Sequence, residues 1–327
     1  MTAPLVTVLY DGGLPPNMDA IEAIARVRTA RADELPKSLP GTEVLLAWDF
    51  LTPALEPAWP AADRLRWVHT ASAGVDNVLT GELAASDVVL TNSRGVFETP
   101  IAEYVTGWVL MDAKDMLATQ QRQQRREWQH RDTRSVQGQL AVVVGTGPIG
   151  RTVARMLRSV GLRVRGVGRR QRSDDPDFGQ VLAAERLGDA VADADYVVLA
   201  APLTEQTRGM IDRRVLAAMP SQSRLINVGR GELVVESDLV SALESGGIAG
   251  AALDVFEREP LPSESALWTM PQVFVSPHMS ADVVGWRDAL ADLFLDNLRR
   301  WCASEPLRNV VDKRLGYVPT PTSEETS

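Results

Sequence analysis

Short apolar runs rich in valine and leucine recur along the chain, and each is followed by a stretch with helical periodicity. This alternation predicts strands of a parallel sheet that are joined by helices. In the first hundred residues the predicted strands are Val6–Tyr10, Val44–Trp48, Trp67–Ala71 and Val88–Thr91. These four runs predict a small α/β domain.

A second series of apolar runs begins near residue 140 and predicts a Rossmann sheet of six strands. The strands are expected at Leu140–Val144, Leu162–Val167, Tyr196–Ala200, Arg224–Val228, Ala251–Val255 and Val273–Ser276.

Two helices are predicted outside this alternation. One long polar helix is expected from Pro100 to Glu127, with its basic end on a solvated or subunit-facing surface. After the last strand, the apolar residues from Leu290 to Trp301 are spaced for an amphipathic helix over Trp286–Ala303, which we expect to pack on the first domain. The polar tail over 319–327 is expected to be disordered.

Composition narrows the class of protein. The 327 residues, 45% of them hydrophobic and 24% charged, suffice for two globular domains. The net charge of −9 repels polyanions, so nucleic acid is not expected as a partner. The single cysteine, Cys302, excludes an intrachain disulfide, and neither a membrane-spanning stretch nor a signal peptide is apparent. We expect a cytoplasmic protein with no membrane contact and no metal site.

A glycine-rich turn, Gly-Thr-Gly-Pro-Ile-Gly, follows the predicted strand Leu140–Val144. Gly145 permits a tight turn, Gly147 lets a pyrophosphate approach the backbone, and Gly150 lets the next helix pack on the strand. The alternative is an ordinary glycine-rich turn, but the flanking strand and helix favour dinucleotide binding. A Walker phosphate loop is set aside, because it requires lysine where the chain has Arg151.

The end of the second strand of this series indicates the coenzyme. An acidic residue here would bind a ribose 2′-hydroxyl, but the sequence reads Gly168-Arg169-Arg170. Two guanidiniums beside a glycine leave room for a 2′-phosphate and can bind it. We therefore predict NADP(H) as the preferred cofactor, with NAD(H) left open. The alternative is that both arginines belong to a surface turn.

Three later strands are followed by Arg230, Glu259 and His278. Ligands of open parallel sheets bind beyond the carboxyl ends of the strands, so we expect these residues in one site. Reduction of a ketone by hydride leaves charge on oxygen, and His278 is the predicted proton donor. Glu259 would orient its ring and favour the charged form, while the guanidinium of Arg230 would clamp a carboxylate and polarise the adjacent carbonyl.

Each of these residues has a structural alternative when it is taken alone. His278 could be a hydrogen-bonded loop histidine, Arg230 a charge at a helix end, and Glu259 a solvated turn residue. Their convergence from three strands favours the catalytic interpretation.

With these motifs, three further segments resemble the D-isomer-specific 2-hydroxyacid dehydrogenase family, in its glyoxylate/hydroxypyruvate reductase-like branch. The segments are Thr70–Asp76, Thr91–Glu103 and Pro202–Asp212, and the resemblance covers nearly the whole chain. It implies an oxidoreductase that reduces a small anionic 2-oxo acid to the D-2-hydroxy acid with NAD(P)H. The three residues above would be its catalytic residues.

The resemblance also implies binding positions. Substrate contacts are expected at Ser72, Ala73, Gly74, Val75, Arg230 and His278. Asp254 is expected near the nicotinamide amide. The complete set of expected cofactor contacts is Gly145, Thr146, Gly147, Pro148, Ile149, Gly150, Gly168, Arg169, Arg170, Ala201, Pro202, Thr207, Val228, Gly229, Asp254 and His278.

The implied fold is α/β, with two Rossmann-like or flavodoxin-like parallel-sheet domains and the cofactor domain inserted into a discontinuous substrate domain. Residues 1–100 and 288–318 are expected to form the substrate domain, 101–287 the NAD(P)-binding Rossmann domain, and 319–327 the disordered tail. A homodimer is expected, with the long polar helix as a plausible arm.

Several alternatives remain at this point. Glyoxylate, hydroxypyruvate and bulkier 2-oxo acids are all open as substrates, whereas formate is disfavoured because Ser276-Pro277 stands where formate dehydrogenases have a glutamine. The alternative function is a non-catalytic dinucleotide-binding regulatory protein of the corepressor type, which a turnover assay would distinguish. A short-chain reductase would need Tyr-x-x-x-Lys on a helix, but Tyr104 is followed by Trp108.

Overall fold

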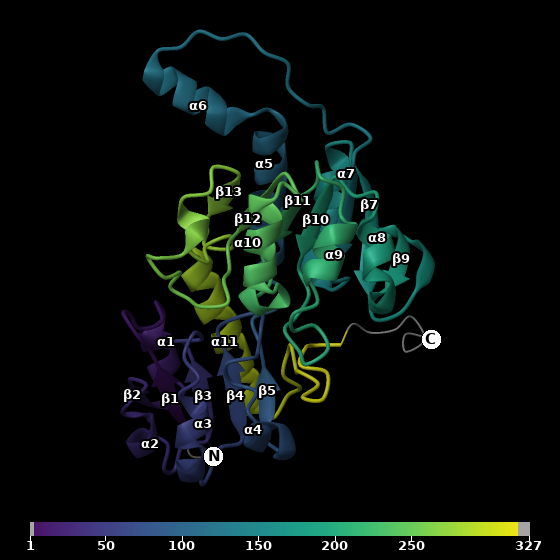
Figure 1. Cartoon of the computed structure of the whole chain (residues 1–327). Helices are drawn as coiled ribbons and strands as arrows, with labels where there is room; N and C mark the ends of the chain where they lie inside the picture. The colour runs from purple at the N-terminus through teal and green to yellow at the C-terminus, as the bar shows by residue number, and fades with distance from the viewer. Residues whose placement is uncertain (1–2, 320–327) are drawn as a thin grey trace. The chain divides into compact units, whose positions relative to one another are not determined.

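The computed structural model describes residues 3–319, and the chain divides into two compact units (Figure 1). Unit 1 is drawn from Met1–Phe97 and Val283–Ser327, and unit 2 is Glu98–Asp282. The tail expected over 319–327 lies outside the described residues, except for Pro319. Within residues 3–319, no helix has both the length and the apolar character needed to cross a membrane.

Unit 1 contains a five-stranded parallel sheet with the order β2-β1-β3-β4-β5. Its strands are β1 (Leu5–Leu9), β2 (Arg26–Ala30), β3 (Val44–Ala47), β4 (Trp67–Thr70) and β5 (Val89–Thr91). Its short helices are α1 (Met18–Glu22), α2 (Leu35–Ser38), α3 (Leu55–Ala58) and α4 (Gly81–Ala85), with a 3-10 turn at Trp59–Ala61.

The edge strand β2 is absent from the sequence-based prediction. Its sequence, RVRTA, leaves Arg26 and Arg28 exposed, because β2 pairs on one side only, with β1. An edge strand with one solvated face carries too few apolar residues to be recognised by an apolar run.

The C-terminal helix α11 (Trp286–Ala303) has the bounds predicted from its periodicity and belongs to unit 1. Phe294 of α11 stacks on Trp67 of β4, with ring centroids 5.4 Å apart. Asn17 donates a hydrogen bond to Asp292 at 2.7 Å. Buried leucines, Leu290 and Leu298, lie on the same face as Phe294. The apolar stripe of α11 therefore completes the core of unit 1.

Unit 2 contains an eight-stranded sheet with the order β13-β12-β11-β10-β6-β7-β9-β8. The strands are β6 (Leu140–Val144), β7 (Arg163–Gly168), β8 (Arg172–Asp175), β9 (Gly179–Ala183), β10 (Tyr196–Leu199), β11 (Arg224–Asn227), β12 (Gly250–Leu253) and β13 (Val273–Val275). All neighbours are parallel except β8 and β9.

The predicted count of six strands was therefore too low by two. All six predicted strands are present, but β8 and β9 extend the sheet beyond β7. The sequence of β8, RSDD, has no apolar residue. Ion pairs hold it instead, because Arg151 of the neighbouring helix bonds both carboxylate oxygens of Asp175 at 2.9 Å. A charged strand of this kind escapes prediction from apolar runs.

The single helix predicted from Pro100 to Glu127 is two helices, α5 (Glu98–Ala113) and α6 (Met116–Arg125). The break is at Asp115, whose φ of 48° is left-handed. Arg131 donates to the Asp115 carboxylate at 2.6 Å and to its carbonyl oxygen at 2.8 Å, which fixes the bend from a loop 16 residues away. In Figure 1, α6 and the following loop project from the rest of unit 2, and no residue of α6 is buried.

The remaining helices of unit 2 connect its strands. They are α7 (Pro148–Ser159), α8 (Leu187–Val191), α9 (Arg213–Ala218) and α10 (Glu236–Glu244), with 3-10 turns at Ala184–Arg186, Gly231–Leu233 and Ala266–Trp268. The order of the sheet reverses at β6, from which the chain runs outward through β7 and then back to β10. Such a reversal is the usual ligand site of an open α/β sheet.

Candidate active site

The glycine-rich turn between β6 and α7 has the geometry of a phosphate loop. Gly145 has a φ of 108°, and a Cβ there would lie 2.5 Å from the carbonyl oxygen of Ala200. A Cβ on Gly150 would lie 1.9 Å from the carbonyl oxygen of Gly145. Gly147 is the N-cap of α7 and has no atom within 4 Å of its would-be Cβ, so the helix N-terminus is open to an anion. These residues fit the pyrophosphate of a dinucleotide.

The segments after β10 and β11 adjoin this turn. A Cβ on Gly145 would lie 2.6 Å from the backbone nitrogen of Ala201, and a Cβ on Gly229 would lie 3.1 Å from the Ala201 carbonyl oxygen. Thr207 donates to the carbonyl oxygen of Pro202 at 2.7 Å, which closes the loop after β10. The expected contacts at Ala201, Pro202, Thr207, Val228 and Gly229 therefore lie on the same sheet edge as the phosphate loop.

The end of β7 also approaches the phosphate loop. A Cβ on Gly168 would lie 2.8 Å from Oγ1 of Thr146, so a larger residue at this position would press on the turn. Arg169 and Arg170 follow at the surface and are exposed.

A third arginine, Arg172, also lies at this corner. Its Nη2 donates to Oγ1 of Thr146 at 3.2 Å, and its Nε pairs with Asp175 at 3.3 Å. Sequence reasoning missed Arg172, although it belongs to the same run, Arg-Arg-Gln-Arg. That run was the available signal, but strand β8, which turns Arg172 back toward the phosphate loop, could not be predicted from apolar runs.

Asp175 anchors this corner. Burial opposes its ionisation, but hydrogen bonds from Arg151 and from the backbone amides of Asp177 and Phe178 outweigh that effect and lower the pKa of Asp175 to about 2. The carboxylate therefore stays charged at neutral pH and keeps Arg151 and Arg172 in place.

On the same sheet edge, His278 is bonded to Glu259. The two atoms His278 Nδ1 and Glu259 Oε2 are 2.7 Å apart, and about a third of each side chain is exposed. The backbone amide of Phe256 donates to Oε1 of Glu259 at 3.0 Å. Burial opposes ionisation of Glu259, but the bond to His278, the charge of His278, the Phe256 amide and the charge of Arg230 together lower its pKa below the usual value.

Arg230 lies on the loop after β11, and that loop packs directly on the loop after β12. A Cβ on Gly231 would lie 1.8 Å from the backbone carbonyl carbon of Phe256. Asn227 sets the turn, because its side chain donates to the carbonyl oxygen of Arg230 at 2.9 Å and accepts from the Gly229 amide at 3.1 Å. The structure thus brings Arg230, Glu259 and His278 together from three neighbouring strand ends.

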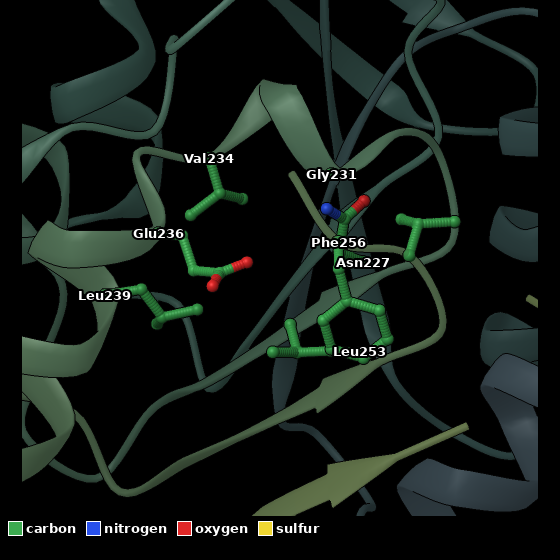
Figure 2. A pocket seen from close by; sticks show the side chains of 8 residues that line it. Asn227, Gly231, Val234, Glu236, Leu239, Leu253 and Phe256 are labelled. Carbon is green, nitrogen blue, oxygen red and sulfur yellow. The ribbon is translucent and has the colours of Figure 1, made fainter. Parts of the chain in front are cut away.

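A cavity of about 10 Å³ lies behind the Gly231 turn, close to the volume of one water. Figure 2 shows the carboxylate of Glu236 directed into it, with Leu239 and Val234 on one side and Phe256 on the other. This space is too small for a 2-oxo acid, so it is not the substrate pocket.

Asp254 is buried beneath the histidine loop. Its carboxylate accepts hydrogen bonds from the amides of Met279 and Ser280, both at 2.9 Å, and its carbonyl oxygen accepts from the His278 amide at 2.8 Å. Asp254 therefore fixes the backbone on both sides of the His278 side chain.

The expected substrate loop, Ser72–Val75, belongs to unit 1 and follows β4. Ser72 donates to the carbonyl oxygen of Gly74 at 2.6 Å, and Asn92 donates to that of Ala73 at 2.6 Å. These bonds give the loop a fixed shape at the carboxyl end of a parallel strand. Among the residues that the structure describes, no cluster of side chains is suited to hold a metal ion.

Comparisons with known proteins identify the family of the chain. A family model for the D-isomer specific 2-hydroxyacid dehydrogenase, NAD binding domain, matches residues 106–280. The glyoxylate reductase of Thermococcus kodakarensis is 32% identical over 272 residues, which cover 80% of each chain. The glyoxylate/hydroxypyruvate reductase A of Arabidopsis thaliana is 31% identical over 238 residues, or 72% of this chain and 74% of that one.

Solved structures agree as well. The NADPH-dependent glyoxylate/hydroxypyruvate reductase of Sinorhizobium meliloti, in complex with NADP and sulfate, superimposes with a TM-score of 0.82 at 30% identity, covering 97% of this chain and 100% of that one. The family model spans more than half of the sequence. The chain therefore belongs to the D-isomer specific 2-hydroxyacid dehydrogenase family, and it is an NAD(P)-dependent oxidoreductase that reduces 2-oxo acids.

Proposed function

We propose that this enzyme reduces small 2-oxo acids, of the size of glyoxylate and hydroxypyruvate, to the D-2-hydroxy acids with NADPH as the preferred coenzyme. The observation that carries the proposal is the bond between His278 and Glu259 at the carboxyl edge of the unit 2 sheet, close to Arg230. A proton donor and a guanidinium on the same edge as a phosphate loop are what this reduction needs. The names of the three reductases above support the substrate size.

In this proposal His278 supplies the proton. Because Glu259 holds Nδ1, the transfer to the substrate oxygen falls to Nε2. The hydrogen bond to the Glu259 carboxylate fixes the plane of the ring, so Nε2 is already directed to the carbonyl when the carbonyl accepts a hydride. The reduced nicotinamide, when bound, supplies that hydride.

Arg230 is proposed to hold the substrate carboxylate and to polarise the carbonyl beside it. A guanidinium has five donors in a planar fork, of which one bonds the carbonyl oxygen of Gly229 at 2.8 Å. That bond, together with the Asn227 turn, orients the fork. A lysine would lack the bidentate geometry.

We infer that the preference for NADPH comes from the arginines after β7. Gly168 contributes no acidic group that would repel a 2′-phosphate, and Arg172 reaches Thr146 at the phosphate loop. Arg169 and Arg170 add positive charge at the same corner. The Sinorhizobium meliloti relative, named as NADPH-dependent and bound to NADP, supports this inference.

We further propose that unit 2 is the coenzyme domain and unit 1 the substrate domain, with the backbone of Ser72–Val75 binding the substrate carboxylate. The chain divides at residues 97/98 and 282/283, close to the domain limits proposed from the sequence, 1–100 with 288–318 and 101–287. The bonds from Ser72 and Asn92 that shape this loop support a binding role.

A homodimer and a cytoplasmic location complete the proposal. The segment of α6 and the loop after it exposes Met116, Leu117 and Trp128, of which Trp128 is fully exposed. Apolar side chains on a projecting arm are suited to an interface with a second copy of the chain. A single cysteine is in keeping with a reducing compartment.

The experiment that tests the function is a turnover assay. The oxidation of NADPH and, separately, of NADH is followed with glyoxylate, hydroxypyruvate, pyruvate, phenylpyruvate and branched 2-oxo acids. Turnover with NADPH above NADH, fastest with glyoxylate and hydroxypyruvate, is the expected result. Binding of coenzyme without turnover of any of these acids would contradict the proposal and favour the corepressor-like alternative.

A further inference from the structure

A chain of hydrogen bonds connects the first helix of unit 2 to the loop that carries His278. The hydroxyl of Tyr104, on α5, lies 2.5 Å from Oγ of Ser276, just after β13. Ser276 in turn donates to Oδ1 of Asp254, just after β12, at 2.6 Å. The three residues come from segments as far as 172 positions apart.

The available protons decide which group donates in each of these hydrogen bonds. Ser276 uses its only hydroxyl proton in the bond to Asp254, so it must accept from Tyr104. Burial raises the pKa of Tyr104 to about 12, with the Ser276 bond opposing this shift and the Asp254 charge adding to it. The phenol therefore keeps its proton at neutral pH and can donate it.

This series of hydrogen bonds ends at the Asp254 carboxylate, which holds the backbone next to His278. The Asp254 carboxylate accepts the amides of Met279 and Ser280, so the two residues after His278 are bonded to it. His278 itself has a left-handed φ of 51°, which is uncommon for a residue with a side chain. Such a conformation persists only where surrounding bonds enforce it.

We propose that Tyr104 is a positioning residue for the proton donor: through Ser276 it fixes the Asp254 carboxylate, and through Asp254 the backbone of His278–Ser280. This inference rests on the role proposed above for His278. Tyr104 itself touches neither of the reacting groups in this arrangement, so its effect is on the geometry of the proton transfer. A displacement of a fraction of an ångström in such a donor reduces the rate of the chemical step.

The test replaces Tyr104 with Phe, which removes the hydroxyl and keeps the ring. Loss of one buried hydrogen bond should lower kcat by about 5- to 10-fold, with the KM for NADPH unchanged. Ser276→Ala should lower kcat similarly, and the double variant should be no worse than Ser276→Ala, because both changes cut the same chain. Ser276→Thr keeps a hydroxyl and should retain most of the activity.

Hydrogen exchange gives a readout that is independent of turnover. In Tyr104→Phe the amides of Met279 and Ser280 should exchange faster than in the unaltered chain, while the amides of β6 should not. The matched control is Tyr196→Phe, which removes the hydroxyl of another buried tyrosine, a hydroxyl that donates to Asp112 at 3.0 Å. The control should leave kcat and the exchange of Met279 and Ser280 unchanged.

Two results would overturn the inference. One is unchanged exchange at Met279 and Ser280 in Tyr104→Phe. The other is a loss of kcat that adds in full to that of Ser276→Ala, or that Tyr196→Phe reproduces. If the unaltered protein reduces none of the 2-oxo acids, the proposed function fails, but the exchange experiment still decides whether Tyr104 fixes the backbone of Met279 and Ser280.

Discussion

Gly231 and Phe256 meet backbone against backbone, with only 1.8 Å between the position of a Cβ on Gly231 and the carbonyl carbon of Phe256. This contact brings the loop of Arg230 against the loop of Glu259. The spacing of two proposed catalytic groups therefore depends on a residue that takes no part in the chemistry.

Gly231→Ala should accordingly separate the two loops. Neither backbone can yield as a flexible side chain would, so we expect kcat/KM to fall by roughly 10²-fold, since small misplacements of catalytic groups have effects of this order. Gly188→Ala is the control, because a Cβ on Gly188 meets no atom within 4 Å. Equal activity of Gly231→Ala and Gly188→Ala would show that the loop contact is unimportant.

Replacing His278 with Asn should remove the proton donor and keep the loop, because Asn tolerates a left-handed φ. We expect kcat to fall by about 10²- to 10⁴-fold, the range for general acid catalysis. Affinity for NADPH, measured by fluorescence titration, should persist because the Gly145–Gly150 turn is unchanged. Substantial turnover by this variant would remove His278 from the mechanism.

Arg172→Ala should weaken binding of NADPH without affecting NADH. A hydrogen-bonded charge pair with the 2′-phosphate contributes about 1.5–3 kcal/mol, which corresponds to a KM increase of about 10- to 150-fold. The comparison variant is Arg186→Ala, whose arginine pairs with Asp189 at an exposed site. If the KM values for both coenzymes rose together, Arg172 would support the Gly145–Gly150 turn and would not bind the 2′-phosphate.

His69, in β4 of unit 1, should make stability depend on pH. Its ring is fully buried between Thr91, at 2.8 Å, and Ser93, at 3.3 Å, and burial lowers its pKa from 6.5 to about 3. The folded chain thus holds His69 neutral, whereas the unfolded chain takes up a proton below pH 6.5. The stability that this difference contributes is present in full above pH 6.5 and is lost progressively as the pH falls toward 3.

The measurement is the urea midpoint of unfolding at pH 7.5 and at pH 5. His69→Gln keeps a polar side chain that does not titrate, so the midpoint should fall less between the two values than in the unaltered chain. His130 is exposed, so the urea midpoint of His130→Gln should fall between the two pH values as much as that of the unaltered chain. If the urea midpoint of His69→Gln fell between pH 7.5 and pH 5 as much as that of the unaltered chain, groups other than His69 would account for the loss of stability in acid.

The arm of α6 offers a test of the dimer. Leu117→Asp combined with Trp128→Asp places charge on two exposed apolar positions, and we expect the dimer to dissociate because burying an unpaired carboxylate is costly. Sedimentation equilibrium measures the result. Leu14→Asp alters an apolar position of similar exposure in unit 1 and should not change the assembly. If the double variant still sedimented with the mass of a dimer, the interface would lie elsewhere on the protein.

The sequence by itself determined the α/β class, six strands of the larger sheet, the glycine-rich turn and helix α11, because each depends on a local pattern of apolar residues or glycines. It also placed Arg230, Glu259 and His278 in the loops that follow three successive strands. Residues at the ends of parallel strands meet at one edge, so their proximity follows from the order of the strands.

Only the tertiary structure decided the features that depend on contacts between distant segments. The charged strand β8 exists because Asp175 binds Arg151 across 24 residues, and it places Arg172 at Thr146. The long polar helix breaks at Asp115, because a hydrogen bond from Arg131 holds Asp115 in a left-handed conformation. Tyr104 meets Ser276 from 172 positions away in the sequence. Hydrogen bonds and ion pairs of this kind leave no periodicity in the sequence, since their partners are brought together by the fold.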